Sequence, residues 1–250
     1  FLQHMEKINY TKLIIASGSR ARLLPSMTSF AGHLNFITSY TDVMEYKKQI
    51  AEANKFFIFG GDLVGFKFLK MLANMGKNIT FMIDPDSFWP FHLTDDMLDK
   101  ILTNLSKLNV SIIIDDDITS IESQENAFMV TTRKGIKKTI DMVFSFNGLI
   151  PNIEFAKGTG IDIDHGILVN EYLKTNTNDI YACGSCAQIY NPAINRYTTS
   201  IGWPNAVAQG EVAALNLLGD HKIIKPVGKK YFDLQGEKIK TTWWEDIDDE

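Results

Sequence analysis

Short apolar runs alternate along the chain with stretches whose apolar residues recur at helical spacing. An apolar run that ends in glycine or polar turn residues predicts a buried strand, whereas apolar residues at i, i+3 and i+4 predict an amphipathic helix. Strands that alternate with helices predict an α/β fold with doubly wound, parallel, Rossmann-like sheets. The predicted strands are 12–16, 55–59, 78–83, 110–114, 142–146, 166–169 and 179–182, with a small antiparallel insert from 118–121 and 128–132. The predicted helices are 43–54, capped at Thr41-Asp42, then 63–75, 95–108 and 204–218.

The turn between the second predicted strand and its helix reads GGDLVG. In a dinucleotide-binding strand–helix–strand unit this turn has the pattern G-x-G-x-x-G, and an acidic residue about 20 residues later binds the ribose. Gly60 and Gly65 supply the first and last glycines, and Asp84 supplies the acid, which favours NAD over NADP. We therefore predict a dinucleotide-binding unit over 55–84, whose two strands are parallel neighbours. Its candidate cofactor-binding residues are Gly60, Gly61, Asp62, Leu63, Val64, Gly65 and Asp84.

Asp62 stands where the pattern has its middle glycine. That glycine lets the backbone approach the pyrophosphate on the helix N-terminus, so a carboxylate there adds bulk and a charge of the wrong sign. Two like charges about 4 Å apart repel by roughly 1 kcal/mol in water and about 4 kcal/mol near a protein surface. The alternative role of Asp62 is a helix N-cap, which leaves the unit folded but weakens or abolishes NAD binding. We expect weak NADH binding that improves on Asp62→Gly.

Composition and charge are those of a globular protein. The 250 residues are 45% apolar and 22% charged, which permits one large domain or two of ordinary size. The net charge of -5 disfavours nucleic acid or an anionic membrane as the main partner. Cys183 and Cys186 are the only cysteines, no apolar run approaches the length of a membrane span, and the N-terminus shows no signal peptide. We therefore expect a cytoplasmic protein.

Several stretches follow one another in a recognisable order: 10–19 (YTKLIIASGS), the glycine turn, 147–152 (NGLIPN) and 179–187 (DIYACGSCA). Together they resemble the pyridine nucleotide–disulfide oxidoreductase family, whose members are FAD enzymes that use NAD(P)H. The stretch 203–210 (WPNAVAQG) resembles the branch with NADH:rubredoxin oxidoreductases and the flavin module of nitrite reductases. The resemblance covers nearly the whole chain up to about residue 220.

The resemblance implies an NAD-binding domain inserted in a partial FAD-binding domain. The NAD-binding domain is then 44–149, and the two FAD-binding pieces are 1–43 and 150–225. The remaining stretch, 226–250, is then a tail or the start of a truncated interface domain.

The resemblance also implies how FAD is held. The segment 179–187 places a residue at the ribityl chain, and the helix from Pro204 directs its N-terminus at the isoalloxazine ring, where a positive dipole end suits a reduced, anionic flavin. Ser17 and Gly18 lie at the crossing between the domains. The further cofactor-binding candidates are Ser17, Gly18, Gly148, Gly184, Ser185 and Trp203.

Several features depart from the family pattern. No glycine motif for the FAD diphosphate precedes Ile14, so the chain is an excised piece, or a second polypeptide completes the FAD domain, or FAD is not bound. Ser185 stands where the family usually carries Asp, and a hydroxyl bonds a ribityl oxygen more weakly than a carboxylate does. Asp62 weakens the NAD site, and the family's interface domain is nearly absent after Lys225.

Each remaining candidate has two interpretations. Cys183 and Cys186 form a C-x-x-C pair, but they lie inside the flavin segment, so packing is favoured over a redox or metal role. We favour a charged loop over a cation site for 115–117, and a cover for the core over an adenine contact for 88–91. Trp203 is interpreted as a flavin neighbour rather than as a packed helix-start residue. The histidines show no metal spacing, and we predict no metal site.

We expect a flavoprotein oxidoreductase in which NADH delivers hydride to FAD and the flavin passes electrons to a small redox protein, without a general acid or base. The alternative is an incomplete or degenerate, non-catalytic relative that keeps the fold and binds little or no cofactor. A visible spectrum of the purified protein separates the two hypotheses, because the flavoprotein is yellow.

Overall fold

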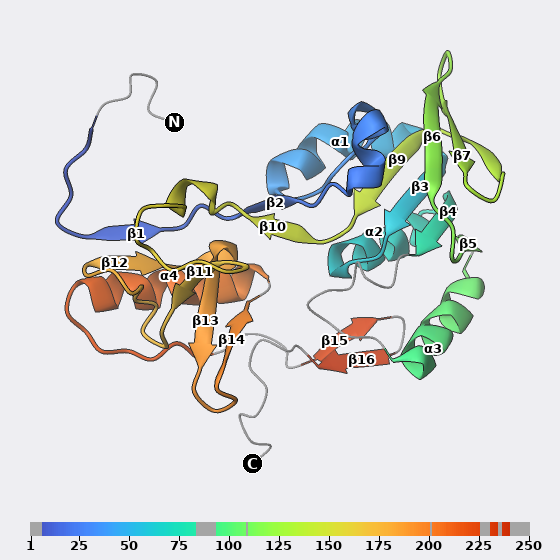
Figure 1. Cartoon of the computed structure of the whole chain (residues 1–250). Helices are drawn as coiled ribbons and strands as arrows, with labels where there is room; N and C mark the ends of the chain where they lie inside the picture. The colour runs from blue at the N-terminus through green and yellow to red at the C-terminus, as the bar shows by residue number, and fades with distance from the viewer. Residues whose placement is uncertain are drawn as a thin grey trace. The chain divides into compact units, whose positions relative to one another are not determined.

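A computed structural model of the chain describes residues 7–83, 94–108, 110–200, 202–225, 231–234 and 237–240. The chain divides into two compact units (Figure 1). Unit 1 comprises Phe1–Ser19, Ile150–Lys230 and Thr241–Glu250, and unit 2 comprises Arg20–Leu149 and Tyr231–Lys240. The strands β2 (Ser19–Ala21) and β10 (Leu149–Pro151) pair with each other. The boundary between the two units falls within each of these strands, after Ser19 in β2 and after Leu149 in β10.

Unit 2 is built on a parallel four-stranded sheet with the strand order β5-β4-β3-β9. Its strands are β3 (Lys55–Gly60), β4 (Asn78–Ile83), β5 (Val110–Ile113) and β9 (Met142–Phe146). Phe56 of β3 lies beside Ile79 of β4 on one side and beside Met142 of β9 on the other. The predicted parallel sheet is therefore confirmed, and so is the prediction that β3 and β4 are parallel neighbours.

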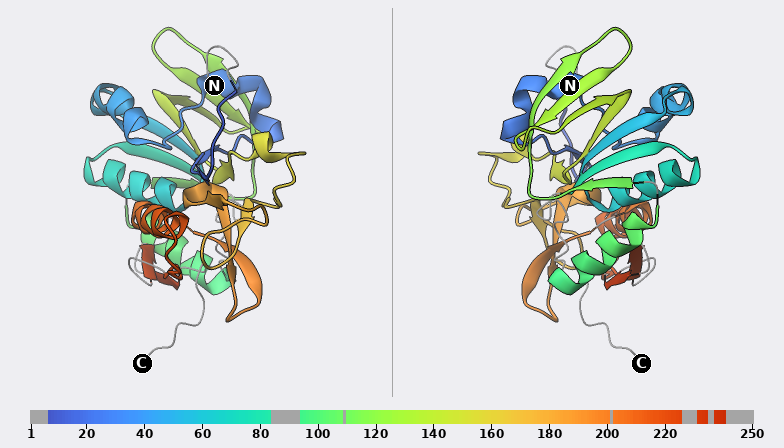
Figure 2. Two further views of the ribbon diagram at one scale, coloured as in Figure 1. Left: turned by 90° about the vertical axis from the view of Figure 1, so that its left-hand side faces the viewer. Right: turned by 90° about the vertical axis from the view of Figure 1, so that its right-hand side faces the viewer.

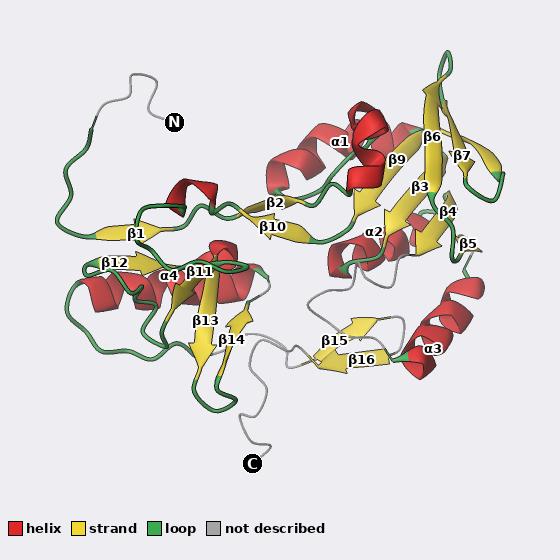
Figure 3. Cartoon of the chain, in the orientation of Figure 1, coloured by secondary structure: helices red, strands yellow, loops and turns green. Residues whose placement is uncertain are grey.

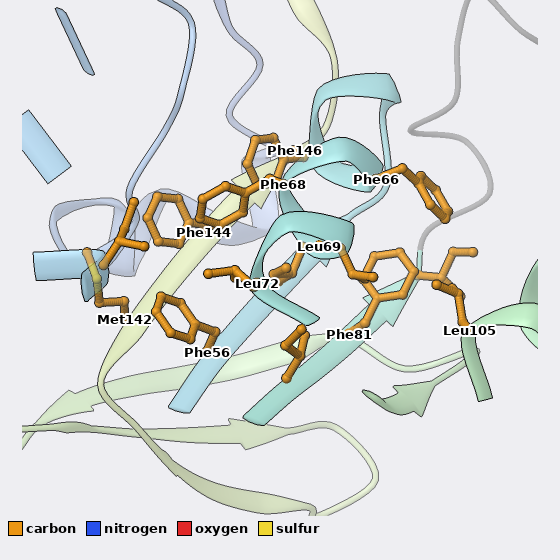
Figure 4. Close-up of a cluster of buried hydrophobic side chains, with 14 of the residues drawn as sticks. Phe56, Phe66, Phe68, Leu69, Leu72, Phe81, Leu105, Met142, Phe144 and Phe146 are labelled. Atoms are coloured by element: carbon orange, nitrogen blue, oxygen red, sulfur yellow. The ribbon is translucent and has the colours of Figure 1, made fainter. Parts of the chain in front are cut away.

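Helices cover one face of this sheet. They are α1 (Tyr40–Glu52), α2 (Leu63–Asn74) and α3 (Asp95–Ser106) (Figure 2). Because side chains alternate along a strand, Phe56 and Ile58 share this face and pack with Leu69 and Leu72 of α2. Figure 4 shows Phe56, Leu69 and Leu72 in one aromatic-rich core with Phe68 and Phe144. The ring centroids of Phe68 and Phe144 are 4.6 Å apart.

The opposite face of the sheet is covered by a 3-10 helix and a meander. These are η1 (Pro25–His33) and the antiparallel strands β6 (Ile118–Ser123), β7 (Phe128–Thr132) and β8 (Lys137–Ile140). Phe30 of η1 and Val130 of β7 pack with Phe57 and Phe59 of β3. The predicted antiparallel insert is confirmed, whereas its apolar pattern reveals neither β8 nor η1. The packing of η1 explains why unit 2 begins at Arg20, while the sequence places the domain boundary after residue 43.

In its described residues, unit 1 is built on two small sheets and one long helix. The strands β1 (Leu13–Ile15) and β12 (Ile180–Ala182) pair in parallel, as do β11 (Ile167–Val169) and β13 (Ala187–Asn191), and β14 (Arg196–Thr199) pairs antiparallel with β13. Ile15, Ile180 and Ala213 of α4 (Trp203–Leu217) belong to one buried core. The predicted strands β1, β11 and β12 and the predicted helix α4 are present, but β13 and β14, which are richer in polar residues, escape prediction.

Local chemistry sets the helix ends. The N-cap of α1 is Ser39, not Thr41-Asp42 as predicted, because Ser39 and Asp42 form a capping box in which each side chain accepts from the other's amide. Thr94 caps α3 as predicted. Gly76, with a φ of 72°, follows the end of α2, also as predicted.

The predicted C-terminal tail contains regular structure. The strands β15 (Tyr231–Leu234) and β16 (Glu237–Lys240) form an antiparallel hairpin that belongs to unit 2 (Figure 3). The acidic end of the chain, 241–250, lies outside the described residues.

Candidate functional site

The predicted dinucleotide corner lies at the C-terminal end of β3. Gly60 and Gly61 have φ angles of 102° and 143°, and Asp62 is the N-cap of α2. The corner thus has the strand–turn–helix form in which a phosphate rests on a helix N-terminus. Asp84 and 88–91, the other predicted parts of this site, lie outside the described residues.

Close packing against β9 requires two of the corner glycines. A Cβ atom on Gly60 would lie 2.1 Å from the carbonyl oxygen of Phe146, and one on Gly65 would lie 2.8 Å from the Cβ of Phe146. A side chain at either position would require Phe146 to shift: its backbone for Gly60 and its side chain for Gly65. The sequence pattern ascribes both glycines to cofactor binding, but packing against Phe146 favours glycine at both positions even when no cofactor is bound, and most strongly at Gly60.

The Asp62 carboxylate bonds three backbone amides. Its Oδ1 accepts from the amides of Val64 at 3.0 Å and Gly65 at 2.9 Å, and its Oδ2 accepts from the amide of Gly148 at 3.1 Å. The N-cap interpretation is therefore confirmed. The third bond joins residues far apart in sequence, so the local pattern around Asp62 cannot reveal it.

Burial raises the pKa of Asp62 above its ordinary value, and the three backbone hydrogen bonds oppose that shift without cancelling it. A diphosphate needs the same kind of donors, because it also accepts bonds from amides at a helix N-terminus. Since Asp62 already uses the amides of Val64 and Gly65, the corner as observed does not fit the diphosphate of a dinucleotide.

A buried acceptor lies beside the corner. Asn147 follows β9 and is 3% exposed, and its Nδ2 donates to the Oγ of Ser145 at 2.7 Å. Its Oδ1, which would lie 2.9 Å from a Cβ on Gly60, has no hydrogen-bond partner among the described residues. Burial of an unsatisfied acceptor costs free energy, so the position suits a ligand donor better than an anion.

In unit 1, Ser17 and Gly18 are tied to Asn152. The Oγ of Ser17 donates to the carbonyl oxygen of Asn152 at 2.6 Å, and the Nδ2 of Asn152 donates to that of Ser17 at 3.0 Å. The amide of Asn152 also donates to the carbonyl oxygen of Gly18, whose φ is 67°. These bonds give Ser17 and Gly18 a structural role.

Gly184 and Ser185 lie in the 3-10 turn η4 (Gly184–Cys186), which packs on α4. The amide of Gly184 donates to the Oε1 of Gln209 at 2.7 Å, and Gln209 is completely buried. The Oγ of Ser185 accepts from the Oγ of Ser19 at 3.0 Å. Gln209 and Ser19 thus position two of the predicted flavin residues. The sequence marks neither as a candidate, because their partners are distant along the chain.

Trp203, the first residue of α4, is 81% exposed. This exposure excludes the alternative that Trp203 is packed in the core. No side chain caps α4, because its N-cap is Gly202. An exposed indole, an uncapped helix N-terminus and the half-buried hydroxyl of Ser185 are groups that fit a flavin ring with a ribityl chain.

The cysteine pair belongs to the core of unit 1. Cys183 and Cys186 are buried and unlinked, and burial raises the pKa of Cys183 to about 11. Cys186 donates to the carbonyl oxygens of Ile15 and Cys183. A buried thiol with a raised pKa is a poor nucleophile, so the structure supports packing over redox chemistry.

The acidic loop of unit 2, 115–117, is held in place by hydrogen bonds and an ion pair. Burial acts to raise the pKa of Asp116, but hydrogen bonds from Thr132 and from the amides of Asp117 and Lys134 lower it overall. Arg133 lies 3.4 Å from Asp117. These contacts support the charged-loop interpretation. Within the described ranges, no group of three or more His, Cys, Asp or Glu residues could hold a metal ion, and no helix is long and apolar enough to cross a membrane.

Comparison with protein families gives a match over most of the chain. The family model described as pyridine nucleotide-disulphide oxidoreductase matches residues 2–210. The NADH-rubredoxin oxidoreductase of Clostridium acetobutylicum is 30% identical over 221 residues, which cover 88% of this chain and 52% of that protein. The nitric oxide reductase FlRd-NAD(+) reductase of Aliivibrio fischeri is 29% identical over 185 residues, covering 74% of this chain and 48% of that protein. The chain thus spans about half the length of these relatives.

Solved structures show the same fold. The putidaredoxin reductase of the covalent putidaredoxin reductase–putidaredoxin complex superposes with a TM-score of 0.75 at 23% identity, covering 91% of this chain and 56% of that one. A NAD-dependent persulfide reductase from A. fulgidus superposes with a TM-score of 0.76 at 24% identity, covering 89% of this chain and 42% of that one.

Proposed function

Because the chain belongs to the pyridine nucleotide-disulphide oxidoreductase family, we propose that it forms the core of an NADH-dependent flavoprotein reductase that passes electrons to a small redox protein. Relatives named for rubredoxin, putidaredoxin and flavorubredoxin-type reduction support this acceptor class. FAD, when bound, supplies the chemistry by accepting hydride and releasing single electrons. The residues of this chain bind and orient.

Unit 1 contributes the FAD contacts in this proposal. The observation that carries it is the packing of η4 against the start of α4, which brings Ser185 and the start of an uncapped helix into one small region. Ser19 and Ser185 would bond the ribityl hydroxyls, and Trp203 would cover the ring. Gln209 keeps Gly184 in its positive-φ turn and thereby positions Ser185.

Unit 2 contributes the NADH contacts. The corner from Gly60 to Gly65 would hold the dinucleotide once the side chain of Asp62 leaves the amides of Val64 and Gly65, and Asp84 would bind its ribose diol, which favours NADH over NADPH. The parallel order β5-β4-β3-β9 supports this assignment, because such sheets bind nucleotides at the C-terminal ends of their strands.

A degenerate, non-catalytic relative is the second candidate. The specific observation in its favour is the Asp62 carboxylate, which bonds amides that a diphosphate would use. This candidate predicts a folded protein that takes up neither FAD nor NADH.

The test begins with purified protein mixed with excess FAD and desalted. We expect a yellow protein whose flavin bands bleach when NADH is added without oxygen. Trp203→Ala should weaken FAD binding about tenfold, because stacking on an aromatic side chain contributes roughly 1–3 kcal/mol. Tyr197→Ala is the matched control, since Tyr197 is also exposed in unit 1 but lies outside the proposed site. A colourless protein that retains no FAD would exclude the flavoprotein hypothesis for this chain.

A further inference from the structure

We propose that Asp62 is a built-in competitor of the dinucleotide, and that a diphosphate binds at the corner only by displacing Asp62 and so releasing Gly148. This inference rests on the proposed function, because it takes the corner to be the NADH site. It goes further by assigning to Asp62 an autoinhibitory contact that couples the corner to the end of β9.

The first step is that backbone amides of the turn already have acceptors within the protein. The amides of Val64 and Gly65 both donate to Oδ1 of Asp62. The amides of Gly61 and Asp62 itself both donate to the carbonyl oxygen of Phe146, at 2.9 Å and 3.2 Å. Four amides of the turn therefore already donate within the protein, and an incoming diphosphate finds the helix donors free only after the side chain of Asp62 turns away.

The second step is the nature of the bound group. The donor set already holds an acidic side chain, because both carboxyl oxygens of Asp62 accept from backbone amides. The same amides that make a helix N-terminus attractive to phosphate here bind an acidic group of the chain itself. A diphosphate and an ionised Asp62 cannot share these donors, since like charges about 4 Å apart repel.

The third step is the link to Gly148. Its amide donates to Oδ2 of Asp62, and its carbonyl oxygen accepts from the amide of Arg22 at 3.0 Å. The peptide groups around Gly148 are thus tied both to the start of α2 and to the residue after β2. Gly148 directly precedes β10, inside which the chain leaves unit 2. Displacement of Asp62 breaks one of these ties and leaves the amide of Gly148 without its acceptor.

The test compares wild type with Asp62→Gly and Asp62→Ser. Asp62→Gly removes all three bonds. Asp62→Ser keeps a hydroxyl that can cap α2, but this neutral side chain is too short to accept from the amide of Gly148 as well. Asp62→Ser therefore replaces Asp62→Gly in the test if the glycine variant fails to fold. Ser39→Gly is the matched control, because it deletes the N-cap of α1 in the same unit.

Binding is measured by calorimetry with inorganic pyrophosphate and with NADH. Backbone amide resonances of Val64, Gly65 and Gly148 are followed in the same titrations. We expect pyrophosphate and NADH to bind both Asp62 variants at least about tenfold more tightly than wild type, which corresponds to the loss of a repulsion of roughly 1.4 kcal/mol or more. Ser39→Gly should bind as wild type does. When NADH saturates the wild-type protein, the amide resonance of Gly148 should shift toward its position in Asp62→Ser.

The outcomes separate this inference from the proposed function. Pyrophosphate that binds the Asp62 variants tightly, together with NADH that binds none of the proteins, supports the competition and rejects the NADH reductase. NADH that saturates wild type without any change at Gly148 rejects the inference and leaves the reductase standing. Equal pyrophosphate affinity in wild type and in both Asp62 variants, or no binding to any of them, overturns the inference.

Discussion

Replacement of Gly60 by alanine should destabilise unit 2 far more than a surface glycine substitution does. The added methyl group would meet the carbonyl oxygen of Phe146 at 2.1 Å, and the φ of 102° is one that side-chain-bearing residues rarely adopt. Backbone strain costs roughly 1–2 kcal/mol and overpacking roughly 1–3 kcal/mol. We therefore expect the free energy of unfolding to fall by about 2–5 kcal/mol.

Three further alanine substitutions separate the two causes. Gly135 has a φ of 83° and open space around it, so Gly135→Ala should cost only the strain, about 1–2 kcal/mol. Gly65 has an ordinary φ but a crowded Cβ position, so Gly65→Ala should cost about 0–2 kcal/mol after the helix propensity gained from alanine. Gly32 has neither problem, and Gly32→Ala should be nearly neutral.

The assay is urea unfolding of the four variants, monitored by circular dichroism rather than by tryptophan fluorescence. All four substituted residues lie inside unit 2. If Gly60→Ala loses no more stability than Gly135→Ala, the close approach of β3 and β9 does not require this glycine. Its presence would then have to be explained by the cofactor alone.

Three other predictions concern single side chains. Burial raises the pKa of Asp62 above 3.8, so its stabilising contribution is complete below pH 3.8 and is lost as the pH rises through the folded-state pKa. Over that range the free energy of unfolding of wild type should fall relative to that of Asp62→Asn. A constant or rising difference between the two proteins in denaturant titrations would contradict the assignment. With a pKa of about 11, Cys183 should resist iodoacetamide at pH 8 in the folded protein, as should Cys186, and both should be alkylated in urea; mass spectrometry that finds rapid labelling of the folded chain would exclude the packed arrangement. Asn216 is 5% exposed and forms hydrogen bonds with the backbone of Tyr172 and with both polar backbone groups of Lys222. Asn216→Ala should lower the free energy of unfolding in urea by about 2–4 kcal/mol. A decrease under about 0.5 kcal/mol would show that these bonds contribute little to stability.

The sequence predicts the parallel elements of unit 2 well, because their signals are local. β3 and β4 are nearly continuous apolar runs, as expected of strands buried on both faces, and α2 ends at a glycine. The N-cap role of Asp62 follows from its place before a helix. The bond from Asp62 to Gly148 and the contact between Gly65 and Phe146 depend on how β9 lies in the sheet, which no local pattern encodes.

The elements that escape prediction are the polar or irregular ones. β14 contains Arg196 and two threonines with partly exposed side chains, and η1 has glycine and proline within or next to its apolar residues. The candidate flavin site shows the same division. Its turn residues stand out by motif, but Gln209 and Ser19 act through partners that only the fold brings near.

The place of β9 at the side of β3 has a consequence for how unit 2 forms during synthesis. β9 is the last strand of the sheet to be made, and Met142 must reach a position beside Phe56 across a long stretch of chain. Until then β3 has an open edge with unpaired backbone groups, flanked by phenylalanines that are fully buried in the finished protein. Long-range parallel pairing is slow, because the chain loses the entropy of loop closure before the contacts between the strands can form. A nascent chain that stops before β9 therefore exposes this edge and its phenylalanines, and we expect it to aggregate more readily than the finished protein.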